Sequence, residues 1–370
     1  MVTGDTHLVE IAEGKIRYMV PEKYNRKGPG SRGREPFYNR QMEFNRDVFI
    51  SFLRAVARNG DTVLDAMAAT GIRSARIASE VNTDLSITAN DTNHAAVELM
   101  RMNFSRTGAG NVKVTDRDAR TIMSEERFDI IDLDPFGTPV EFLPSALLSV
   151  RNGKYLAVTA TDAAMLCGSA RGCKRRYLCI AKRWPFMHET GLRNLIGYVV
   201  RMAASYDRAA EPLLSYFTDH YFRIYFRLVM GSTRAEKQLA NMGYAHYVGS
   251  TGERWTDRES GTDFTGPMWI GPLHDSTLLE KMNTESWFGT SDRVSARLEI
   301  WKGEALAPAL YYTMDEVASK MKVNMPDREK LLKVLGRRFG TCRTHFDPKG
   351  FKTEAGFDEI CEAIRSVQKV

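Results

Sequence analysis

The pattern of hydrophobic and polar positions predicts alternating strands and helices over the first half of the chain. Short apolar runs, typical of buried strands, alternate with stretches in which apolar residues recur at helical spacing. The predicted strands cover 62–67, 85–91, 111–116, 128–134 and 155–162, and the predicted helices cover 71–81, 94–104 and 140–150. Strands separated by helices favour a parallel sheet covered on both faces, so the expected fold class is α/β with a doubly wound sheet.

The segments around this region have other patterns. Residues 8–20 resemble a short hairpin, and residues 21–36 are basic and rich in glycine and proline, as in a loop or arm. The segments 220–230 and 244–250 look like strands that could complete the sheet.

Length and composition bound the domain organisation. A chain of 370 residues with 43% apolar residues can bury extensive cores and suggests two domains. The polar stretch 251–265 is a candidate linker, and the remainder is mostly helical with basic loops. We expect a first domain over 1–250 and a second, smaller α+β domain over 251–370.

Charge and cysteine content indicate the partner and compartment. The net charge of +6 suits a polyanionic partner without proving one. Five cysteines exclude a disulfide scaffold and favour a reducing cytoplasm. No apolar run is long enough to span a membrane, so we expect no membrane contact.

Three carboxylates follow consecutive predicted strands. Asp65 ends the first strand, Asp91 ends the second and Asp118 follows the third. In a doubly wound sheet the ligand lies beyond the carboxyl ends of the strands, where an acid at the second strand can accept ribose hydroxyls. Asp118 with Ala119 could contact an adenine edge. The alternative for each carboxylate is a helix cap, although three at consecutive strand ends favour a nucleoside site.

The loop after the first strand lacks the glycines that a diphosphate needs. It contains Gly71 but no G-x-G-x-x-G motif, which disfavours a dehydrogenase. A nucleoside with a small charged tail suits this loop better, and S-adenosylmethionine is such a ligand. Arg73 and Arg46 are candidates for pairing with its carboxylate.

The residues Asp134-Pro135-Phe136-Gly137 close the fourth strand and match the [D/N]-P-P-[F/Y/W] pattern of amino-methyltransferases, with Phe directly after Pro. The exocyclic amine of a nucleobase is a poor nucleophile because its lone pair is delocalised into the ring. A carboxylate and a backbone carbonyl that accept its two N–H groups favour a tetrahedral nitrogen, and Asp134 and Pro135 could supply them. Phe136 could stack on the base. The alternative is an Asp-Pro turn without function.

Together these segments resemble the tRNA (guanine-26, N2)-dimethyltransferases. The matching segments, in chain order, are 37–47, 64–76, 89–103, 131–143, 157–168, 188–207, 219–228, 266–275 and 343–355. The resemblance implies a class I methyltransferase domain followed by a family-specific, tRNA-binding C-terminal domain. It also implies mono- and dimethylation of the N2 amine of guanine 26.

The resemblance also assigns residues. It implies S-adenosylmethionine binding at Arg46, Arg73, Asp91, Asp118 and Ala119, in addition to Asp65 from the strand-end pattern. It places Asp134 and Phe136 at the guanine, with Phe37 nearby, and we add Thr138 to the substrate contacts.

One departure from the family concerns metal. Many members carry a zinc-binding cysteine cluster between the domains, whereas residues 231–275 contain no cysteine here. Cys167, Cys173 and Cys179 are spaced by six residues, unlike a C-x-x-C zinc clip. We therefore expect no metal.

Three basic runs, at 23–34, 171–183 and 333–352, are candidates for RNA contact. Such runs are more often solvated surface, but a base-modifying pocket reverses the odds because phosphates supply most of the affinity. We favour the middle run as the tRNA contact, with Arg171, Lys174, Arg175 and Arg176.

The sequence predicts an S-adenosylmethionine-dependent tRNA guanine methyltransferase of the cytoplasm, with no obligate protein partner. One alternative is a methyltransferase of adenine or of a protein amide, which could use the same turn at Asp134. The other is a non-catalytic RNA-binding protein or chaperone, against which the three strand-end carboxylates argue.

Overall fold

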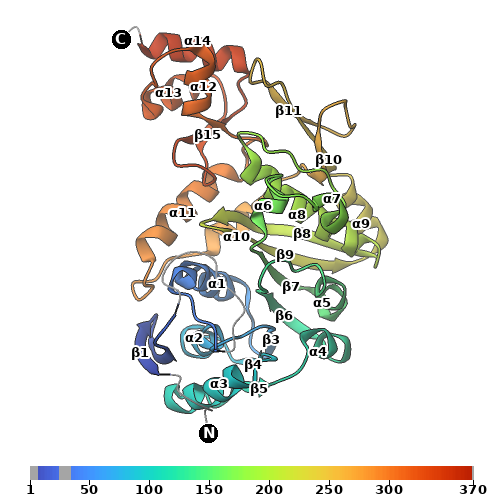
Figure 1. Cartoon of the computed structure of the whole chain (residues 1–370), viewed down its shortest axis with the longest axis vertical. Coiled ribbons are helices and arrows are strands. Elements are labelled where there is room, and N and C mark those ends of the chain that lie inside the picture. The colour runs from blue at the N-terminus through green and yellow to red at the C-terminus, as the bar shows by residue number, and fades with distance from the viewer. Residues whose placement is uncertain (1–6, 25–34, 369–370) are drawn as a thin grey trace. The chain divides into compact units, whose positions relative to one another are not determined.

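The computed structural model of the protein describes residues 7–24 and 35–368 (Figure 1). The chain forms two compact units, which we call unit 1 and unit 2. Unit 1 comprises Met1–Thr161, Tyr225–Met230 and Glu280–Leu298. Unit 2 comprises Asp162–Ile224, Gly231–Leu279 and Glu299–Val370.

The expected single boundary at 250/251 does not coincide with this division. Residues 162–224 group with the C-terminal part of the chain, and 280–298 group with the N-terminal part. The sequence suggests one boundary at a polar stretch, because it does not reveal that the chain passes from one unit to the other several times.

A seven-stranded sheet has the order β5-β4-β3-β6-β7-β9-β8. The pairs β3–β4, β3–β6, β4–β5 and β6–β7 are parallel. Numbered along the chain, this order is 3-2-1-4-5-7-6, which is typical of class I methyltransferases. The strand order reverses at β3: β4 and β5 are added on one side of it, and β6 and β7 on the other. Ligands of such folds bind at this switch point, beyond the carboxyl ends of the strands. The expected α/β fold class is confirmed.

Unit 1 contains the strands and helices that alternate along the first half of the chain. They are β1 (Leu8–Glu13), β2 (Ile16–Pro21), a 3-10 turn (Arg40–Met42), α1 (Glu43–Val56), β3 (Asp61–Asp65), α2 (Ile72–Glu80), β4 (Leu85–Asn90), α3 (His94–Thr107), β5 (Lys113–Thr115), α4 (Ala119–Glu125), β6 (Phe128–Leu133), α5 (Leu143–Ser149) and β7 (Val150–Ala160). The expected hairpin, five strands and three helices of this region are all present. Helix α1 was not predicted, and its buried residues include the charged side chains of Arg46 and Asp47, which obscure an apolar stripe.

Unit 2 begins with α6 (Ala163–Leu166), α7 (Cys173–Tyr177), α8 (Met187–Ala204) and β8 (Arg208–Thr218). Strand β9 (Tyr221–Met230) contributes residues to both units. After α9 (Ser232–Leu239), the strands β10 (Met242–Tyr247), β11 (Arg254–Asp257) and β12 (Thr265–Trp269) form a separate sheet in the order β11-β10-β12. The expectation that 244–250 completes the large sheet is therefore wrong, and the expected linker 251–265 contains β11, because an isolated strand pattern does not reveal its pairing partner.

The remaining elements are both helical and extended, as expected for an α+β region. They are α10 (Ser276–Lys281), α11 (Ser291–Glu304), β13 (Tyr312–Thr313), α12 (Met314–Met321), α13 (Arg328–Leu335), β14 (Thr341–Arg343), β15 (Gly350–Thr353) and α14 (Phe357–Gln368). Figure 1 shows α12, α13 and α14 grouped together near the C-terminus. Within the described ranges, no helix is both long and apolar enough to cross a membrane.

Candidate active site

The carboxyl ends of β3 and β6 bring three acidic residues of unit 1 together. Asp65 ends β3 and is paired in register with Asp132 of β6. Asp134 is the first residue after β6, and it contacts Arg73 together with Asp132. Burial raises the pKa of Asp65 to about 7, since the favourable charge of Arg73 is offset by Asp132 and Asp134.

Arg73, near the start of α2, holds this group together. Its Nη2 lies 2.5 Å from Asp134 Oδ2, and its Nε lies 2.8 Å from Asp132 Oδ2. Its Nη1 donates to Asn45 Oδ1 at 2.9 Å. Asp132 and Asn45 were missed by sequence reasoning. The signal for Asp132 was a charge inside an otherwise apolar strand, which needs a partner when buried.

The turn after β6 presents an aromatic ring to solvent. Pro135 is buried, whereas Phe136 is 43% exposed. The rings of Phe136 and Phe37 meet edge to face, with centroids 4.9 Å apart. The structure therefore brings Phe37, which is distant in sequence, to the turn that carries Asp134 and Phe136.

Backbone contacts fix the end of this turn. Gly137 has φ +77°, in the left-handed region. Its N–H donates to Thr161 Oγ1 at 2.7 Å, and its carbonyl accepts from the Thr161 N–H at 2.8 Å. Thr138 accepts a 3.4 Å hydrogen bond from the Val140 N–H. The hydroxyl of Thr138 thus already has a role in the loop.

Asp91 directly follows β4 and contacts the loop between β3 and α2. Its Oδ2 accepts from the Ala69 N–H and its Oδ1 from the Asn93 N–H, each at 2.8 Å. These two contacts orient the Asp91 carboxylate.

Asp118 and Ala119 begin α4. Asp118 caps the helix by accepting from the Arg120 N–H at 2.8 Å, and its Oδ2 lies 2.5 Å from Arg120 Nη2. The hydrogen bond from the Arg120 side chain is the main reason that the pKa of Asp118 is lowered. Ala119 is buried, so only its backbone and small side chain border any ligand.

Arg46 is engaged elsewhere in unit 1. Its Nε and Nη2 lie 2.6 and 2.7 Å from the two oxygens of Glu13, and its Nη2 also donates to the Asn39 carbonyl. Burial alone would raise the pKa of Glu13, but Arg46 and Arg76 lower it to about 2. Arg46 therefore has a fully charged, bidentate partner.

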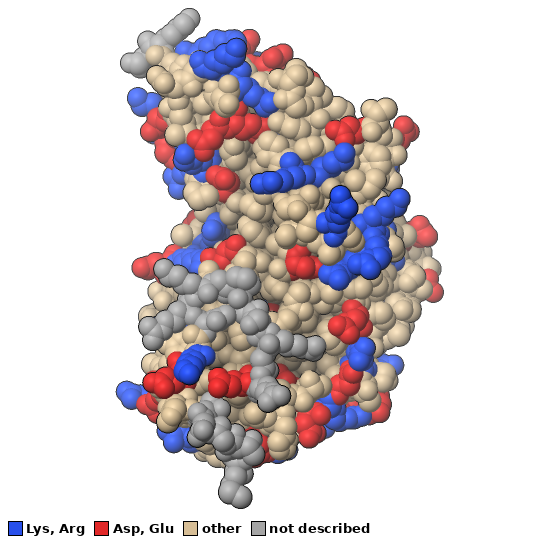
Figure 2. All heavy atoms as spheres, viewed as in Figure 1, with Lys and Arg blue, Asp and Glu red and all other residues tan. Residues whose placement is uncertain are grey.

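Unit 2 carries the expected basic segment on and around α7. Arg171, Lys174 and Arg175 are exposed, and their side chains have no ion pair with any described residue. Arg176 differs, because its Nη1 lies 3.3 Å from Asp162. Figure 2 shows lysine and arginine side chains gathered on the face that bears α7.

In the third basic run, several of the cations already have acidic partners within unit 2. In the third run, Lys352 is buried and its Nζ lies 2.7 Å from Glu189. Arg343 pairs with Glu329 at 2.8 Å. Most of the first run, residues 25–34, lies outside the described residues.

The cysteines are all free, and Cys173 and Cys179 approach each other with their sulfurs 3.5 Å apart. Burial raises the pKa of the Cys167 thiol to about 12. Cys167, Cys173 and Cys179 are all buried in unit 2.

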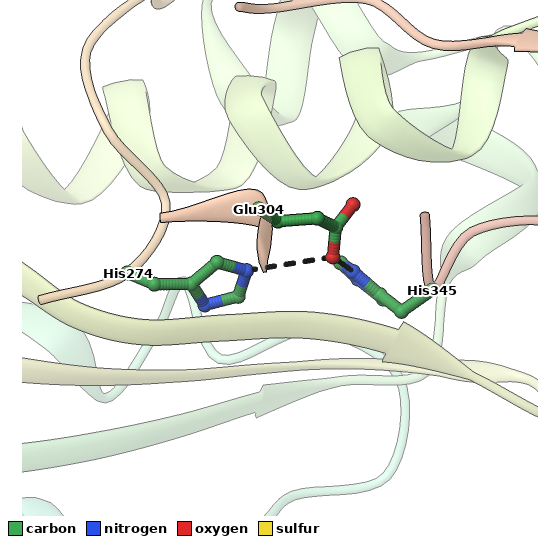
Figure 3. Close-up of side chains that lie close together, drawn as sticks. All are labelled: His274, Glu304 and His345. Carbon is green, nitrogen blue, oxygen red and sulfur yellow. Dashed lines mark hydrogen bonds and ion pairs between the residues drawn. The ribbon is translucent and has the colours of Figure 1, made fainter. Parts of the chain in front are cut away.

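A buried group in unit 2 was not anticipated. His274, Glu304 and His345 each offer a potential metal-ligating atom, and these atoms lie within 4.8 Å of one another (Figure 3). His345 Nδ1 contacts Glu304, and His345 Nε2 accepts from the Phe217 N–H at 3.3 Å. A ring whose Nε2 accepts carries its proton on Nδ1, so His345 donates to Glu304. These contacts are those of a hydrogen-bonded cluster, and the absence of a metal stays a prediction.

Comparisons with known proteins agree with the geometry. A profile of the family described as N2,N2-dimethylguanosine tRNA methyltransferase matches residues 14–365. A relative from Methanocorpusculum labreanum, named tRNA (guanine(26)-N(2))-dimethyltransferase, is 37% identical over 96% of this chain and 97% of its own length. A relative of the same name from Metallosphaera sedula is 35% identical over 97% of each chain.

A solved structure is similar over nearly the whole chain. The structure of Trm1 from Pyrococcus horikoshii in complex with S-adenosyl-L-methionine matches with a TM-score of 0.86 and 32% identity. The match covers 96% of this chain and 100% of that chain. With the sheet order, the acidic strand ends and the Asp-Pro-Phe turn, these similarities lead to one conclusion: the protein belongs to the N2,N2-dimethylguanosine tRNA methyltransferase family.

Proposed function

We propose that this protein transfers methyl groups from S-adenosylmethionine to the N2 amine of a guanine in tRNA, at position 26. The relatives named above carry this activity in their names, and the chain matches them over almost its full length. The monomethyl product retains one N–H and can rotate for a second transfer, so mono- and dimethylguanosine are both expected. A cytoplasmic location and the absence of an obligate protein partner are part of the proposal.

The observation that carries the proposal is the contact between Arg73 and Asp134. Because Arg73 holds Oδ2 of Asp134, the other oxygen, Oδ1, is left to accept an N–H of the guanine amine. The Pro135 carbonyl accepts the second N–H, which favours a pyramidal nitrogen with an available lone pair. Catalysis then rests on positioning more than on base strength.

The aromatic pair sets the plane of the base. Phe136 is exposed and Phe37 packs against it edge to face, so a guanine that stacks on Phe136 displaces or turns one ring. A guanine within folded tRNA hides its amine, and it must therefore leave its stack to reach Asp134.

The residues at the strand ends suit the methyl donor. Asp91 would accept the ribose hydroxyls, Asp118 and Ala119 would border the adenine, and Asp65 would support the floor of the site through Ser74, 2.8 Å away. The donor supplies an electrophilic methyl group when it is bound. Its carboxylate would pair with Arg73, which the surrounding acids already orient, or with Arg46, which would have to share its contacts with Glu13.

Arg171, Lys174, Arg175 and Arg176 are proposed to contact the tRNA backbone, and Thr138 the substrate near the turn. Three of the four basic residues lack ion-pair partners among the described residues, so they can bind phosphate without breaking existing contacts. Arg176 would do so only in competition with Asp162.

The direct test is incorporation of label from the methyl donor into unmodified tRNA, followed by mass spectrometry of the digested nucleosides. We expect monomethylguanosine and dimethylguanosine. Labelled adenine, or label in protein alone, would instead favour the alternative amino-methyltransferase. Binding of tRNA without any transfer would favour the non-catalytic alternative.

A substitution tests the role of the turn. Asp134→Ala is expected to lower the turnover of methylation by ~10³-fold, because the amine loses the acceptor that orients it. Calorimetry with the donor and equilibrium binding of tRNA should give affinities within a few-fold of the wild type. Glu362→Ala, which removes an exposed carboxylate on α14, is the matched control. Unchanged turnover of Asp134→Ala would show that the amine is held elsewhere.

A further inference from the structure

The C-terminal part of unit 2 forms a small subdomain with its own core. Strands β13, β14 and β15 form a sheet in the order β13-β15-β14, and α12, α13 and α14 pack on it (Figure 1). Residues of all three helices and two strands share one buried cluster: Tyr312, Met314, Val317, Leu331, Leu335, Phe351, Ala355, Ile360, Ala363 and Ile364. The chain order strand, helix, helix, strand, strand, with the last strand in the centre, is also that of winged helix-turn-helix modules, in which the second helix contacts nucleic acid.

The second helix of this subdomain, α13, has two opposite faces. Leu331 and Leu335 are buried in the core cluster. Lys330 and Lys333 are exposed on the outside, and Arg337 extends the same face into the turn that follows the helix. The interval of three residues places Lys330 and Lys333 on one face of the helix. We call these two residues and Arg337, in the turn that follows, the α13 basic row.

The α13 basic row is distinguished from neighbouring cations by the lack of partners. The structure gives its three side chains no hydrogen bond or ion pair with any described residue. Several nearby cations have partners instead: Arg328 and Arg343 contact Glu329, Lys349 contacts Asp315, and the guanidinium of Arg338 lies 5.3 Å from the centre of the Phe339 ring. Cations that already have acidic partners gain less from a phosphate than cations that have none.

The charge is also confined to this helix. Residues 328–338 contain five lysines and arginines against one glutamate, whereas α14 contains three acids and one arginine. A uniform charged surface made for solubility would mix both signs on each helix. From Lys330 to Arg337 the row extends over seven residue intervals, about 10 Å at 1.5 Å per residue, which is long enough to lie along successive phosphates of one strand of a duplex.

We propose that the α13 basic row binds the phosphate backbone of a double-helical arm of the tRNA substrate. The inference rests on the proposed function, because tRNA is the polyanion that the enzyme must hold. It adds a contact surface built by the C-terminal subdomain, separate from α7 and from the residues at the site of methyl transfer. The occupant is recognised by charge and spacing, so the contact is independent of base sequence.

The test reverses two charges in the full chain. Lys330→Glu with Lys333→Glu is compared with Arg234→Glu with Lys237→Glu on α9, where the two exposed cations have the same spacing and no partner. Both variants change the net charge equally. Binding of an unmodified tRNA transcript is measured over a series of KCl concentrations, together with the kinetics of methylation.

We expect the α13 variant to bind tRNA about 10-fold more weakly, with a salt dependence reduced by about two units of slope. Its KM for tRNA should rise, while kcat at saturating tRNA and the affinity for the methyl donor stay as in the wild type. The α9 control should bind like the wild type. Lys330→Gln with Lys333→Gln should give an intermediate loss, and circular dichroism verifies that each variant is folded.

Two results would overturn the inference. The α13 variant could show the affinity and salt slope of the wild type, or the α9 control could lose as much affinity as the α13 variant. If the wild-type chain fails to methylate tRNA, the proposed function fails instead. The wild-type reaction run in parallel separates these cases.

Discussion

At the scale of single residues, the site depends on one guanidinium shared by several acceptors. Arg73 contacts Asp132, Asp134 and Asn45, so it is held at three points before any ligand binds. Such prior orientation lowers the reorganisation required in the reaction. The sequence could suggest Arg73 as a partner for a carboxylate, but it could not reveal that the protein supplies two of those carboxylates itself.

Asp65 predicts a pH dependence of stability. Its pKa is raised from 3.8 to about 7 in the folded protein, mainly by burial. The folded state therefore keeps a proton that the unfolded chain releases as the pH rises from 4 to 7. This contribution to stability is present in full at low pH and is lost as the pH rises through about 7.

We expect Asp65→Asn to flatten the fall of the unfolding free energy between pH 4 and 7, by roughly 3 kcal/mol over this range. Urea unfolding of the ligand-free protein at several pH values measures the effect. Some slope should remain, because burial also raises the pKa of Glu43 to about 7. The control is Asp116→Asn, an exposed acid. Parallel curves for wild type and Asp65→Asn would contradict the expectation.

At the scale of elements, the loop between β3 and α2 positions the floor of the site. Gly71 has φ +80° and begins α2 as its cap. A Cβ at this position would lie 2.6 Å from Met100 Cγ and 2.9 Å from Phe104 Cζ of α3. The sequence showed that this loop lacks a diphosphate motif, whereas the need for its single glycine follows from the packing of α3.

Substitution of this glycine tests the packing. Gly71→Ala is expected to destabilise the protein by about 2–4 kcal/mol, because it combines a left-handed conformation with overpacking. Gly108→Ala is the matched control, since Gly108 has φ +74° and open space around the added Cβ. It should cost about 1 kcal/mol, the conformational part alone. Equal losses in thermal unfolding would show that the contact with α3 yields easily.

At the scale of the whole molecule, the charges sort into paired and unpaired groups. The three basic runs look alike in sequence. In the structure, Lys352 lies in a buried ion pair, whereas Lys174 and Arg175 remain exposed and unpaired among the described residues. A cation that is buried with an acid contributes to the fold and little to a surface that binds RNA.

The exposure of Lys174 and Arg175, and their lack of ion pairs with the described residues, make them suitable for testing α7. Lys174→Glu with Arg175→Glu should weaken tRNA binding by about 10-fold and lower its salt slope by about two units. Arg176 is left unchanged, because its loss would also disturb the contact with Asp162. The α9 pair Arg234→Glu with Lys237→Glu again serves as control. A salt slope equal to that of the wild type would remove α7 from the RNA-binding surface.

The sequence alone determined the α/β class, the succession of strands and helices in unit 1, and the place of the Asp134-Pro135-Phe136 turn directly after a strand. These features are local, because hydrophobic periodicity and short motifs are set by residues close together in the chain. The tertiary structure decided the rest: the pairing of β10, the division into interleaved units, and the grouping of Asp65, Asp132 and Arg73. It also decided which cations are buried with acids and which are exposed. Such features depend on which distant segments of the chain come into contact. The free energy of burying a charge depends on the groups that those segments place beside it.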